Sequence, residues 1–568
     1  MSVMDKPKRR AALLSNITPD FIAAKLRRKY DVYIPDGYDT WIQEIFNPAS
    51  ALYTSSPDAA VVLLDGTEAR SWKNFAEAGE RVALWKEALD ALSRRIADIP
   101  VFVSTIDFRL NRIQSFAERK ASVSLADDWC QFVQGKAEEL GNFYILDIAD
   151  VIAETGRKQF YSDKMWYISG MPYSREGVSV TAREIDRALE AAFGARKKII
   201  ALDLDNTLWG GIAGEDGLQG IELSDHKNGQ RYYDFQRQFL EMKKRGVLLA
   251  VNSKNNEEDA ESIIRNHPAM LLRDEDFVSR KINWNDKAEN LQDMERELNL
   301  TESGFIFIDD NPVERMALQA QCPDALVPEF PNDTSELLTF AETLWFDYCR
   351  PLRTLREDAD KTRLYQNEAE RKREFRQSLG LDDYLGKLKI SADIHRMRPE
   401  EAERVAQLCG KTNQFNVTSK RYAKADIEAI ARNPDNAIYV AHMRDKYGDS
   451  GLVSVVILSL TKTTVRIDTF LMSCRVMGRR LEDVIMKELL SRYSGDREII
   501  GEYVPTAKNA PVKDLFDRLG FELTSEDESG RRLYLLRPGV CKLRPVESYH
   551  EILFDGRAVI NRKEADKA

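Results

Sequence analysis

Long apolar runs are missing from the 568-residue sequence. Its apolar stretches stop well short of the ~18 residues that a membrane-spanning helix needs. The basic start, "MSVMDKPKRRAALLS", is followed by only a short apolar stretch, whereas a secretory signal carries about 7–15 apolar residues. We therefore expect a cytoplasmic protein without a membrane span.

Cysteine and histidine are scarce. The six cysteines are scattered without Cys-x-x-Cys spacing, so the sequence predicts neither a disulfide framework nor a zinc site built on cysteine. The five histidines are His226, His267, His395, His442 and His550. No two of them lie at metal-ligand spacing along the chain, and we expect catalysis to depend on carboxylates and lysine instead.

An excess of basic charge is also missing, since the formal net charge is −10. General nucleic-acid binding needs a basic surface to neutralise phosphates, so we do not expect it. The composition, 43% hydrophobic and 31% charged, is typical of globular domains. At ~100–200 residues per domain, the length predicts about three or four domains.

Alternating strand and helix patterns predict two α/β domains, over residues 1–195 and 196–345. In the first, the apolar segments 58–65, 99–105 and 143–148 alternate with helical stretches, which indicates a parallel sheet flanked by helices. In the second, nearly unbroken apolar strands are typical of a sheet covered on both faces. These strands are expected at 197–205, 245–254, 270–273 and 304–311.

The remaining sequence predicts a charged helical connector over 346–385 and an α+β domain over 386–568. The expected order in the last domain is a helix, three strands and a second helix. These elements are predicted at 398–412, 436–445, 450–460, 463–473 and 477–493. The final twenty or so residues are expected to form a frayed polar tail.

The stretch "IIALDLDNTLWGGI" places Asp203 and Asp205 at the end of an apolar strand. Alternate residues leaving a strand point the same way, and active sites of parallel sheets lie beyond the carboxyl ends of their strands. One carboxylate could attack phosphorus while the other handles the proton. Taken alone, the motif fits a solvated turn equally well.

Further polar groups follow the later strands. Ser253 could bind a phosphoryl oxygen, and Lys287 in "INWNDKAEN" could neutralise phosphoryl charge. Asp309 and Asp310 could hold a hard cation, for which Mg²⁺ is the best fit beside a phosphate. Because four such elements occur in order, each after a strand, a solvated surface turn no longer explains the two aspartates well.

Together these residues resemble the four motifs of the haloacid-dehalogenase (HAD) superfamily. The resemblance implies that Asp203 is the phosphorylated nucleophile and Asp205 the general acid and base. It implies substrate binding by Thr207, Ser253, Lys254 and Lys287, and Mg²⁺ binding by Asp203, Asp205, Asp309 and Asp310. The intervals between the motifs leave no room for a full cap domain, so we expect an open, Rossmann-like site.

A narrower resemblance covers residues 198 to about 525. The segments "LDNTLWGGIAGEDGLQGIELS", "SKNNEEDA", "FIDDNPVERM" and "KTNQFNVTSKRY" resemble the FkbH-like family. The resemblance implies an enzyme that takes the glyceryl unit of 1,3-bisphosphoglycerate, removes phosphate, and loads the unit on the phosphopantetheine thiol of an acyl carrier protein.

The alternative is a magnesium phosphatase for a phosphorylated sugar or acyl intermediate of surface-polysaccharide synthesis, with a binding-only C-terminal domain. A scaffold with a decayed site is disfavoured because every motif position carries a competent residue type.

Two departures from the family concern acyl transfer. Asn252 stands where the family often has cysteine, so Cys474 in "MSCRVMGRR" is the remaining relay thiol, unless it is a packed strand-end cysteine. The C-terminal portion resembles the GNAT acyltransferase fold, whose turn would place Arg475 and Gly478 at a coenzyme pyrophosphate. Arg480 replaces a small residue there; it could grip a phosphopantetheine phosphate, or the turn is structural.

Two other segments leave alternatives open. Asn413, Gln414 and Asn416 could hold a glyceryl or pantetheine amide, or their loop caps the next helix. The N-terminal domain resembles the SGNH hydrolases, but no histidine precedes His226, so a triad on Ser15 cannot be completed within it. We interpret this domain as a docking or covering module.

Overall fold

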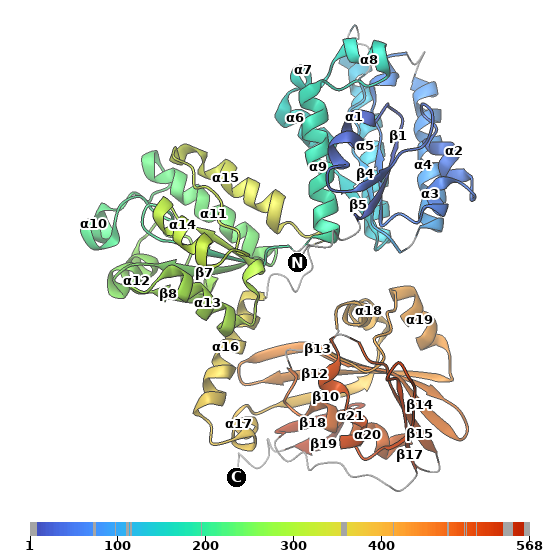
Figure 1. The fold of residues 1–568 in the computed structure, drawn as a ribbon, viewed down its shortest axis with the longest axis vertical. Coiled ribbons are helices and arrows are strands. Elements are labelled where there is room, and N and C mark those ends of the chain that lie inside the picture. Colours follow the sequence, from blue (N-terminus) through green and yellow to red (C-terminus); the bar gives the residue numbers. More distant parts are fainter. Residues whose placement is uncertain are drawn as a thin grey trace. The chain divides into compact units, whose positions relative to one another are not determined.

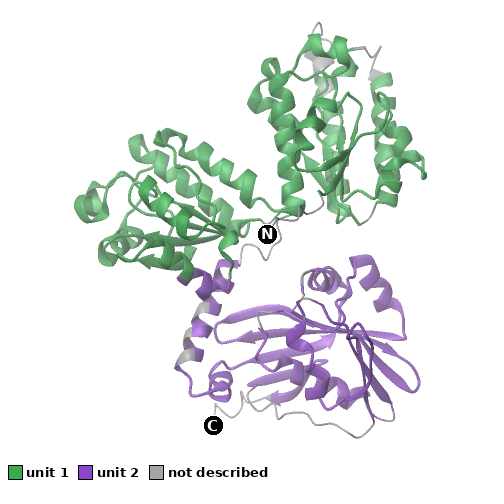
Figure 2. Ribbon diagram, in the orientation of Figure 1, with its two compact units in different colours: residues 1–292, 300–359 green, residues 293–299, 360–568 purple. Residues whose placement is uncertain are grey.

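The computed structural model describes most of the chain, which folds into two compact units (Figures 1 and 2). The first comprises residues 1–292 and 300–359, the second residues 293–299 and 360–568. None of the helices described is both long and apolar enough to cross a membrane. The described residues are 8–71, 75–96, 98–109, 113, 116–194, 196–353, 361–412, 414–473, 476–493, 495, 497–506, 508–537 and 549–561.

The first unit begins with a five-stranded parallel sheet in the order β2-β1-β3-β4-β5. Alternate residues of its strands enter different cores: Leu13 and Val61 pack on one face, Leu14 and Val62 on the other. Burial on both faces explains the unbroken apolar runs. The strands are β1 (Arg10–Ser15), β2 (Asp31–Tyr33), β3 (Ala59–Leu63), β4 (Val101–Ser104) and β5 (Phe143–Leu146).

Helices cover both faces of this sheet, as the alternating pattern predicted (Figure 1). The α/β class is therefore confirmed, while the SGNH resemblance stays a prediction. The helices are α1 (Asp20–Leu26), α2 (Trp41–Phe46), α3 (Ala51–Thr54), α4 (Phe75–Arg95), α5 (Phe116–Glu139), α6 (Ile148–Thr155), α7 (Arg157–Phe160), α8 (Asp163–Ser169) and α9 (Arg175–Phe193).

A second parallel sheet of the same unit has the order β8-β7-β6-β9. Strand β6 (Ile199–Leu202) lies inside it, between β7 (Leu248–Ser253) and β9 (Phe305–Ile308), and β8 (Phe277–Ile282) is an edge. The carboxyl ends of all four strands therefore meet at one edge of the sheet. The helices around it are α10 (Ala213–Gly220), α11 (Gln230–Lys244), α12 (Glu257–Asn266), α13 (Lys287–Leu298), α14 (Pro312–Gln321) and α15 (Leu337–Leu344).

The strand expected at 270–273 is wrong, because the third strand of this sheet is β8. The backbone N–H groups of Leu271 and Leu272 donate instead to Oε1 of the buried Gln236, over 2.9 and 3.3 Å. Met270 and Leu272 still pack in the core. A side-chain amide thus satisfies the backbone of a buried loop, which an apolar pattern alone cannot distinguish from a strand.

The interval between β6 and β7 contains α10 and α11 and no separate cap domain, and residues 196–353 are described without a gap. Phe235 and Phe239 of α11 belong to the core of the sheet. This interval therefore builds the domain rather than a separate cap.

The predicted connector is helical where the structure describes it. It includes a π-helical turn, Trp345–Cys349, and the helices α16 (Lys361–Gln377) and α17 (Leu381–Lys387). Both helices belong to the second unit. The guanidinium of Arg371 donates twice to the buried carboxylate of Asp445, over 2.7 and 2.8 Å, and so fixes α16 to the sheet of that unit.

The second unit is an α+β structure, as predicted. One sheet runs in the order β16-β17-β15-β14-β13-β12-β10-β18-β19, and β11 pairs with β14. Its first seven strands are β10 (Ser391–Arg396), β11 (Phe415–Asn416), β12 (Asn436–Asp445), β13 (Gly448–Leu460), β14 (Thr464–Met472), β15 (Glu498–Tyr503) and β16 (Glu522–Glu526). The others are β17 (Arg532–Leu536), β18 (Glu551–Phe554) and β19 (Arg557–Asn561), with helices α18 (Ala402–Lys411), α19 (Lys424–Arg432), α20 (Leu481–Tyr493) and α21 (Leu515–Arg518).

The expected frayed tail is wrong for residues 549–561, of which 551–561 form a β-hairpin. Strand β18 pairs with β10 in parallel and with β19 in antiparallel orientation. Tyr549 and Ile552 are buried, and the Tyr549 hydroxyl donates to the carbonyl oxygen of Arg479 over 3.0 Å. Burial of these two side chains keeps the segment folded, although its polar C-terminal residues had indicated fraying.

Candidate active site

The carboxyl edge of the second sheet gathers three of the predicted acidic residues around one lysine. Nζ of Lys287 lies 3.0 Å from Oδ2 of Asp203 and 2.5 Å from Oδ2 of Asp309. Oxygen atoms of Asp203, Asp309 and Asp310 lie within 4.8 Å of one another. The first follows β6, the other two follow β9, and the lysine begins α13, so three separate elements build the cluster.

Negative charge exceeds positive charge in this cluster. Burial and the nearby charge of Asp203 raise the pKa of both Asp309 and Asp310. Burial alone would lower the pKa of Lys287, but the charges of Asp203 and Asp309 raise it overall. Three carboxylates beside one ammonium form an oxygen-only set that fits a hard divalent cation such as Mg²⁺.

The Asp205 side chain lies outside the three-carboxylate cluster. Its Oδ1 accepts hydrogen bonds from Trp209 Nε1 at 2.9 Å and from the Ala213 N–H at 3.0 Å. Its Oδ2 accepts one from Asn255 Nδ2 at 2.8 Å. Burial raises the pKa of Asp205 despite these donors, which favours a group that can deliver a proton. The predicted contact of Asp205 with the metal ion stays a prediction.

Two predicted substrate ligands are engaged by the protein itself. The Thr207 hydroxyl accepts a hydrogen bond from the N–H of Asp310 over 3.2 Å, so it positions that aspartate. Nζ of Lys254 forms an ion pair with Glu314 at 2.7 Å. Ser253 is buried at the end of β7. Contacts of these residues with substrate stay predictions.

Buried amides that the sequence analysis missed hold Lys287 in place. Asn252 Nδ2 donates to the carbonyl oxygen of Lys287 over 2.8 Å, and its Oδ1 accepts from Asn290 Nδ2 over 3.1 Å. Asn290 Nδ2 also donates to Asn283 Oδ1 over 3.0 Å. This network connects β7 to the first turn of α13. The sequence signal for this network was the polar residue Asn252 inside an otherwise apolar strand.

Arg315 of α14 is a second missed residue. Its Nη1 donates to the carbonyl oxygens of Asp309 and Asp310, over 3.0 and 2.8 Å, and its Nη2 forms an ion pair with Glu329 at 2.7 Å. Arg315 is almost fully buried. It therefore fixes the backbone that carries both aspartates.

The predicted acyl-transfer residues lie in the second unit, and three of them are outside the described residues: Asn413, Cys474 and Arg475. Gly478 and Arg480 have positive φ angles, 79° and 59°, directly before α20. Nη1 of Arg480 forms an ion pair with Asp382 at 2.8 Å. The structure thus shows a turn whose arginine has a carboxylate partner, and coenzyme binding there stays a prediction.

In the segment "KTNQFNVTSKRY", the side chain of Asn416 is engaged by its own loop. Oδ1 of the buried Asn416 accepts a hydrogen bond from the Ser419 N–H over 2.8 Å, which shapes the loop itself. Gln414 is exposed. Ligand contacts of Gln414 and Asn416 stay predictions.

Two histidines that are not at metal-ligand spacing along the chain meet in the fold. His395 and His442 each place Nε2 3.1 Å from Oε1 of Glu401. They are far apart in sequence and meet because β10 and β12 are neighbouring strands. Spacing along the chain could not reveal this.

In the N-terminal sheet, the Ser15 hydroxyl donates to the carbonyl oxygen of Leu63 over 2.6 Å. Asp163 forms ion pairs with Arg70 at 2.8 Å and Arg109 at 3.3 Å. Both side chains therefore have partners within the N-terminal domain, and the docking or covering role of this domain stays a prediction.

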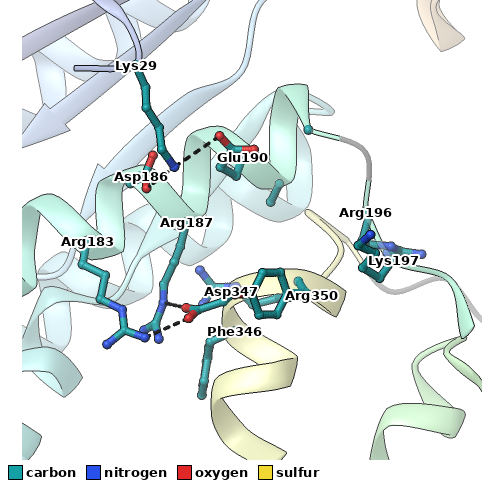
Figure 3. A pocket seen from close by; sticks show the side chains of 13 residues that line it. Lys29, Arg183, Asp186, Arg187, Glu190, Arg196, Lys197, Phe346, Asp347 and Arg350 are labelled. Carbon is teal, nitrogen blue, oxygen red and sulfur yellow. Dashed lines mark hydrogen bonds and ion pairs between the residues drawn. The ribbon is translucent and has the colours of Figure 1, made fainter. Parts of the chain in front are cut away.

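A cavity of about 340 Å³ lies in the first unit, between α9 and the turn Trp345–Cys349. Arg183 and Arg187 both reach the carboxylate of Asp347, at 2.8 and 2.5 Å (Figure 3). None of the aspartates of the candidate active site lines it. Its charges are largely paired among themselves, so the chemistry is better sought at the carboxyl edge of the sheet.

Comparison with known proteins supports the phosphatase-type fold. The N-terminal part of a Bacteroides fragilis protein containing a phosphatase domain, in complex with Mg, is 25% identical, with a TM-score of 0.56. The similarity covers 61% of this chain and 95% of that chain. A putative acetyltransferase of the GNAT family from Desulfovibrio desulfuricans aligns over 26% of this chain and 99% of that chain, at 14% identity and a TM-score of 0.22. No protein-family model and no curated protein matches.

The buried amide network generates a testable prediction. Replacing Asn252 by Ala removes its hydrogen bonds with the Lys287 carbonyl and the Asn290 amide, each of which contributes about 0.5–1.5 kcal/mol. We expect Asn252→Ala to lower both thermal stability and phosphate release. In a double-mutant cycle with Asn290→Ala, the two effects on the free energy of unfolding should be less than additive. Strict additivity would contradict a direct connection between the amides.

Proposed function

We propose that this protein is a magnesium-dependent phosphatase whose nucleophile is Asp203. The observation that carries the proposal is the cluster at the carboxyl edge of the second sheet, where Lys287 contacts both Asp203 and Asp309. Asp310 completes a group of carboxylates that could bind a metal ion. The magnesium complex of the similar phosphatase-domain protein supports the same assignment.

In this reaction an oxygen of Asp203 attacks phosphorus, and the bond between phosphorus and the leaving oxygen breaks. That oxygen takes a proton from Asp205, whose raised pKa suits the task. Water then attacks the aspartyl phosphate, gives its proton to Asp205, and releases phosphate. Lys287 offsets the charge of the phosphoryl oxygens. Held by Asp203, Asp309 and Asp310, Mg²⁺ would supply further positive charge for the same oxygens.

The proposed substrate is a phosphoglyceryl unit derived from 1,3-bisphosphoglycerate, with the glyceryl group passed to the thiol of an acyl carrier protein. An acyl phosphate can acylate a thiol without further activation, and the remaining phosphate ester suits attack by Asp203. The FkbH-like resemblance supports this choice. The open edge supports a substrate carried on a macromolecule, because Trp284, after β8, and Met316, on α14, are 74% and 66% exposed.

Hydrolysis without acyl transfer is the second candidate, with a phosphorylated sugar or acyl intermediate of polysaccharide synthesis as substrate. Asn252 favours it: a relay thiol is absent at this position, and the buried amide that replaces it is bonded to Lys287 and Asn290.

Asp203→Asn should abolish magnesium-dependent phosphate release, since a near-isosteric amide cannot act as the nucleophile. Asp225→Asn is the matched control, because that side chain is 77% exposed and lies in the same domain. We expect the control to retain wild-type turnover. Phosphate release can be followed continuously with a small phosphate ester. Ordinary turnover by Asp203→Asn would refute the assignment.

Carrier loading is tested by intact mass spectrometry of a holo acyl carrier protein incubated with the enzyme, Mg²⁺ and 1,3-bisphosphoglycerate. We expect a glyceryl adduct with the wild type. If transfer precedes dephosphorylation, Asp203→Asn should leave a phosphoglyceryl adduct. Phosphate release with several unmodified carriers would favour the hydrolytic candidate.

A further inference from the structure

We propose that His395, Glu401 and His442 form a second metal site, of the zinc type, in the C-terminal unit. It is separate from the phosphatase cluster in ligand chemistry and in position along the chain, and it does not depend on the proposed phosphatase activity.

The sheet places the two histidines on one face. In the antiparallel pairing of β10 and β12, His395 lies opposite Val440, and His442 lies opposite Asp393. Residues two apart on a strand share a face, so both imidazoles project from the same side. Val440 belongs to the apolar cluster that includes Val405 of α18, which identifies the side covered by that helix. Glu401 immediately precedes α18.

The distances fit coordination by one ion. Each Nε2 atom lies 3.1 Å from Oε1 of Glu401, and all three atoms lie within 4.8 Å of one another. Ligands bound at about 2.0–2.1 Å in tetrahedral geometry are about 3.4 Å apart, so only a small movement is needed. The imidazole rings are nearly parallel, at 16°, with centroids 5.5 Å apart, and both Nε2 atoms approach the same carboxylate oxygen.

The other polar atoms of the ligands are arranged to orient them. Oε2 of Glu401 accepts a hydrogen bond from the Arg398 N–H over 2.8 Å, which leaves Oε1 facing the rings. Nδ1 of His395 is buried and has no hydrogen bond with a described residue, but Oδ2 of Asp393 lies 3.4 Å from it. A carboxylate at the second nitrogen is the usual support of a metal-binding histidine.

A local irregularity of the sheet coincides with the site. The register between β12 and β13 shifts on both sides of His442. Such bulges redirect side chains and are frequent beside functional sites. The bulge therefore gives an independent indication that the direction of this side chain matters.

The ligand set and its exposure indicate the class of metal. Two imidazoles and one carboxylate favour zinc or a similar transition metal, whereas the oxygen-only cluster of Asp203, Asp309 and Asp310 favours Mg²⁺. The His395 side chain is 8% exposed and that of His442 38%. One side of the site is thus accessible, and three protein ligands leave a fourth position for water or a ligand atom.

The test is zinc retention by the full-length protein, dialysed against Zn²⁺ with Mg²⁺ in large excess so that the aspartate cluster holds Mg²⁺. Zinc per chain is measured by elemental mass spectrometry. We expect the wild type to retain one equivalent more than His442→Ala. His226→Ala is the matched control, because His226 is 67% exposed and outside the site, and it should retain the wild-type amount.

Two further variants separate metal binding from folding. Glu401→Gln keeps an oxygen for the Arg398 N–H, so it should fold normally and still lose the zinc. Asp393→Asn should weaken zinc binding about 10–100-fold without removing a ligand. Phosphate release by His442→Ala should equal that of the wild type. Equal zinc retention by the wild type, His442→Ala and Glu401→Gln would overturn the proposal and leave a hydrogen-bonded His–Glu–His group without metal.

Discussion

The ammonium group of Lys287 is the interaction on which the candidate active site depends. Buried carboxylates repel one another unless positive charge lies between them. Lys287 contacts Asp203 and Asp309 directly, and Asp310 joins the same group. One ammonium cannot balance three carboxylates, and the remaining charge is what a divalent cation would neutralise. The same excess of charge makes the edge of the sheet suitable for a phosphoryl group only when the cation is bound.

The surrounding structure fixes this group from several directions. Asn252 ties the lysine backbone to β7, Thr207 accepts from the N–H of Asp310, and Arg315 donates to the carbonyls of both neighbouring aspartates. Catalysis by positioned charge requires that little reorganisation occurs during the reaction. A set of buried hydrogen bonds around the cluster meets that requirement.

The sequence predicted the parts of this site that follow strands. Asp203, Lys287 and Asp310 occur in order after apolar segments, and parallel strands bring their carboxyl ends to one edge. The hydrogen-bond partners of Asn252 and Arg315 were not predictable, because they arise from tertiary contacts that neither the strand nor the helix pattern reveals. The strand expected at 270–273 failed because a short apolar run does not reveal whether its backbone partner is a strand or the side chain of Gln236.

In the second unit, too, local elements were predictable from the sequence and tertiary contacts were not. The helix, three strands and second helix expected in it correspond to α18, β12, β13, β14 and α20, since alternation and helical periodicity are local properties. The approach of His395 and His442 was not, because it arises from the pairing of β10 with β12 and has no local signature. The hairpin at 551–561 was missed because Tyr549 and Ile552 anchor a segment whose polar residues dominate its composition.

The most direct test of the account is to locate the phosphoryl group on the enzyme. The protein is mixed briefly with Mg²⁺ and a phosphate ester, quenched in acid, digested and analysed by mass spectrometry. The account predicts a transient phosphoryl group on Asp203, which decays as substrate is exhausted and does not form without Mg²⁺. Rapid phosphate release without any phosphorylated aspartate, or with the phosphoryl group on another residue, would contradict it.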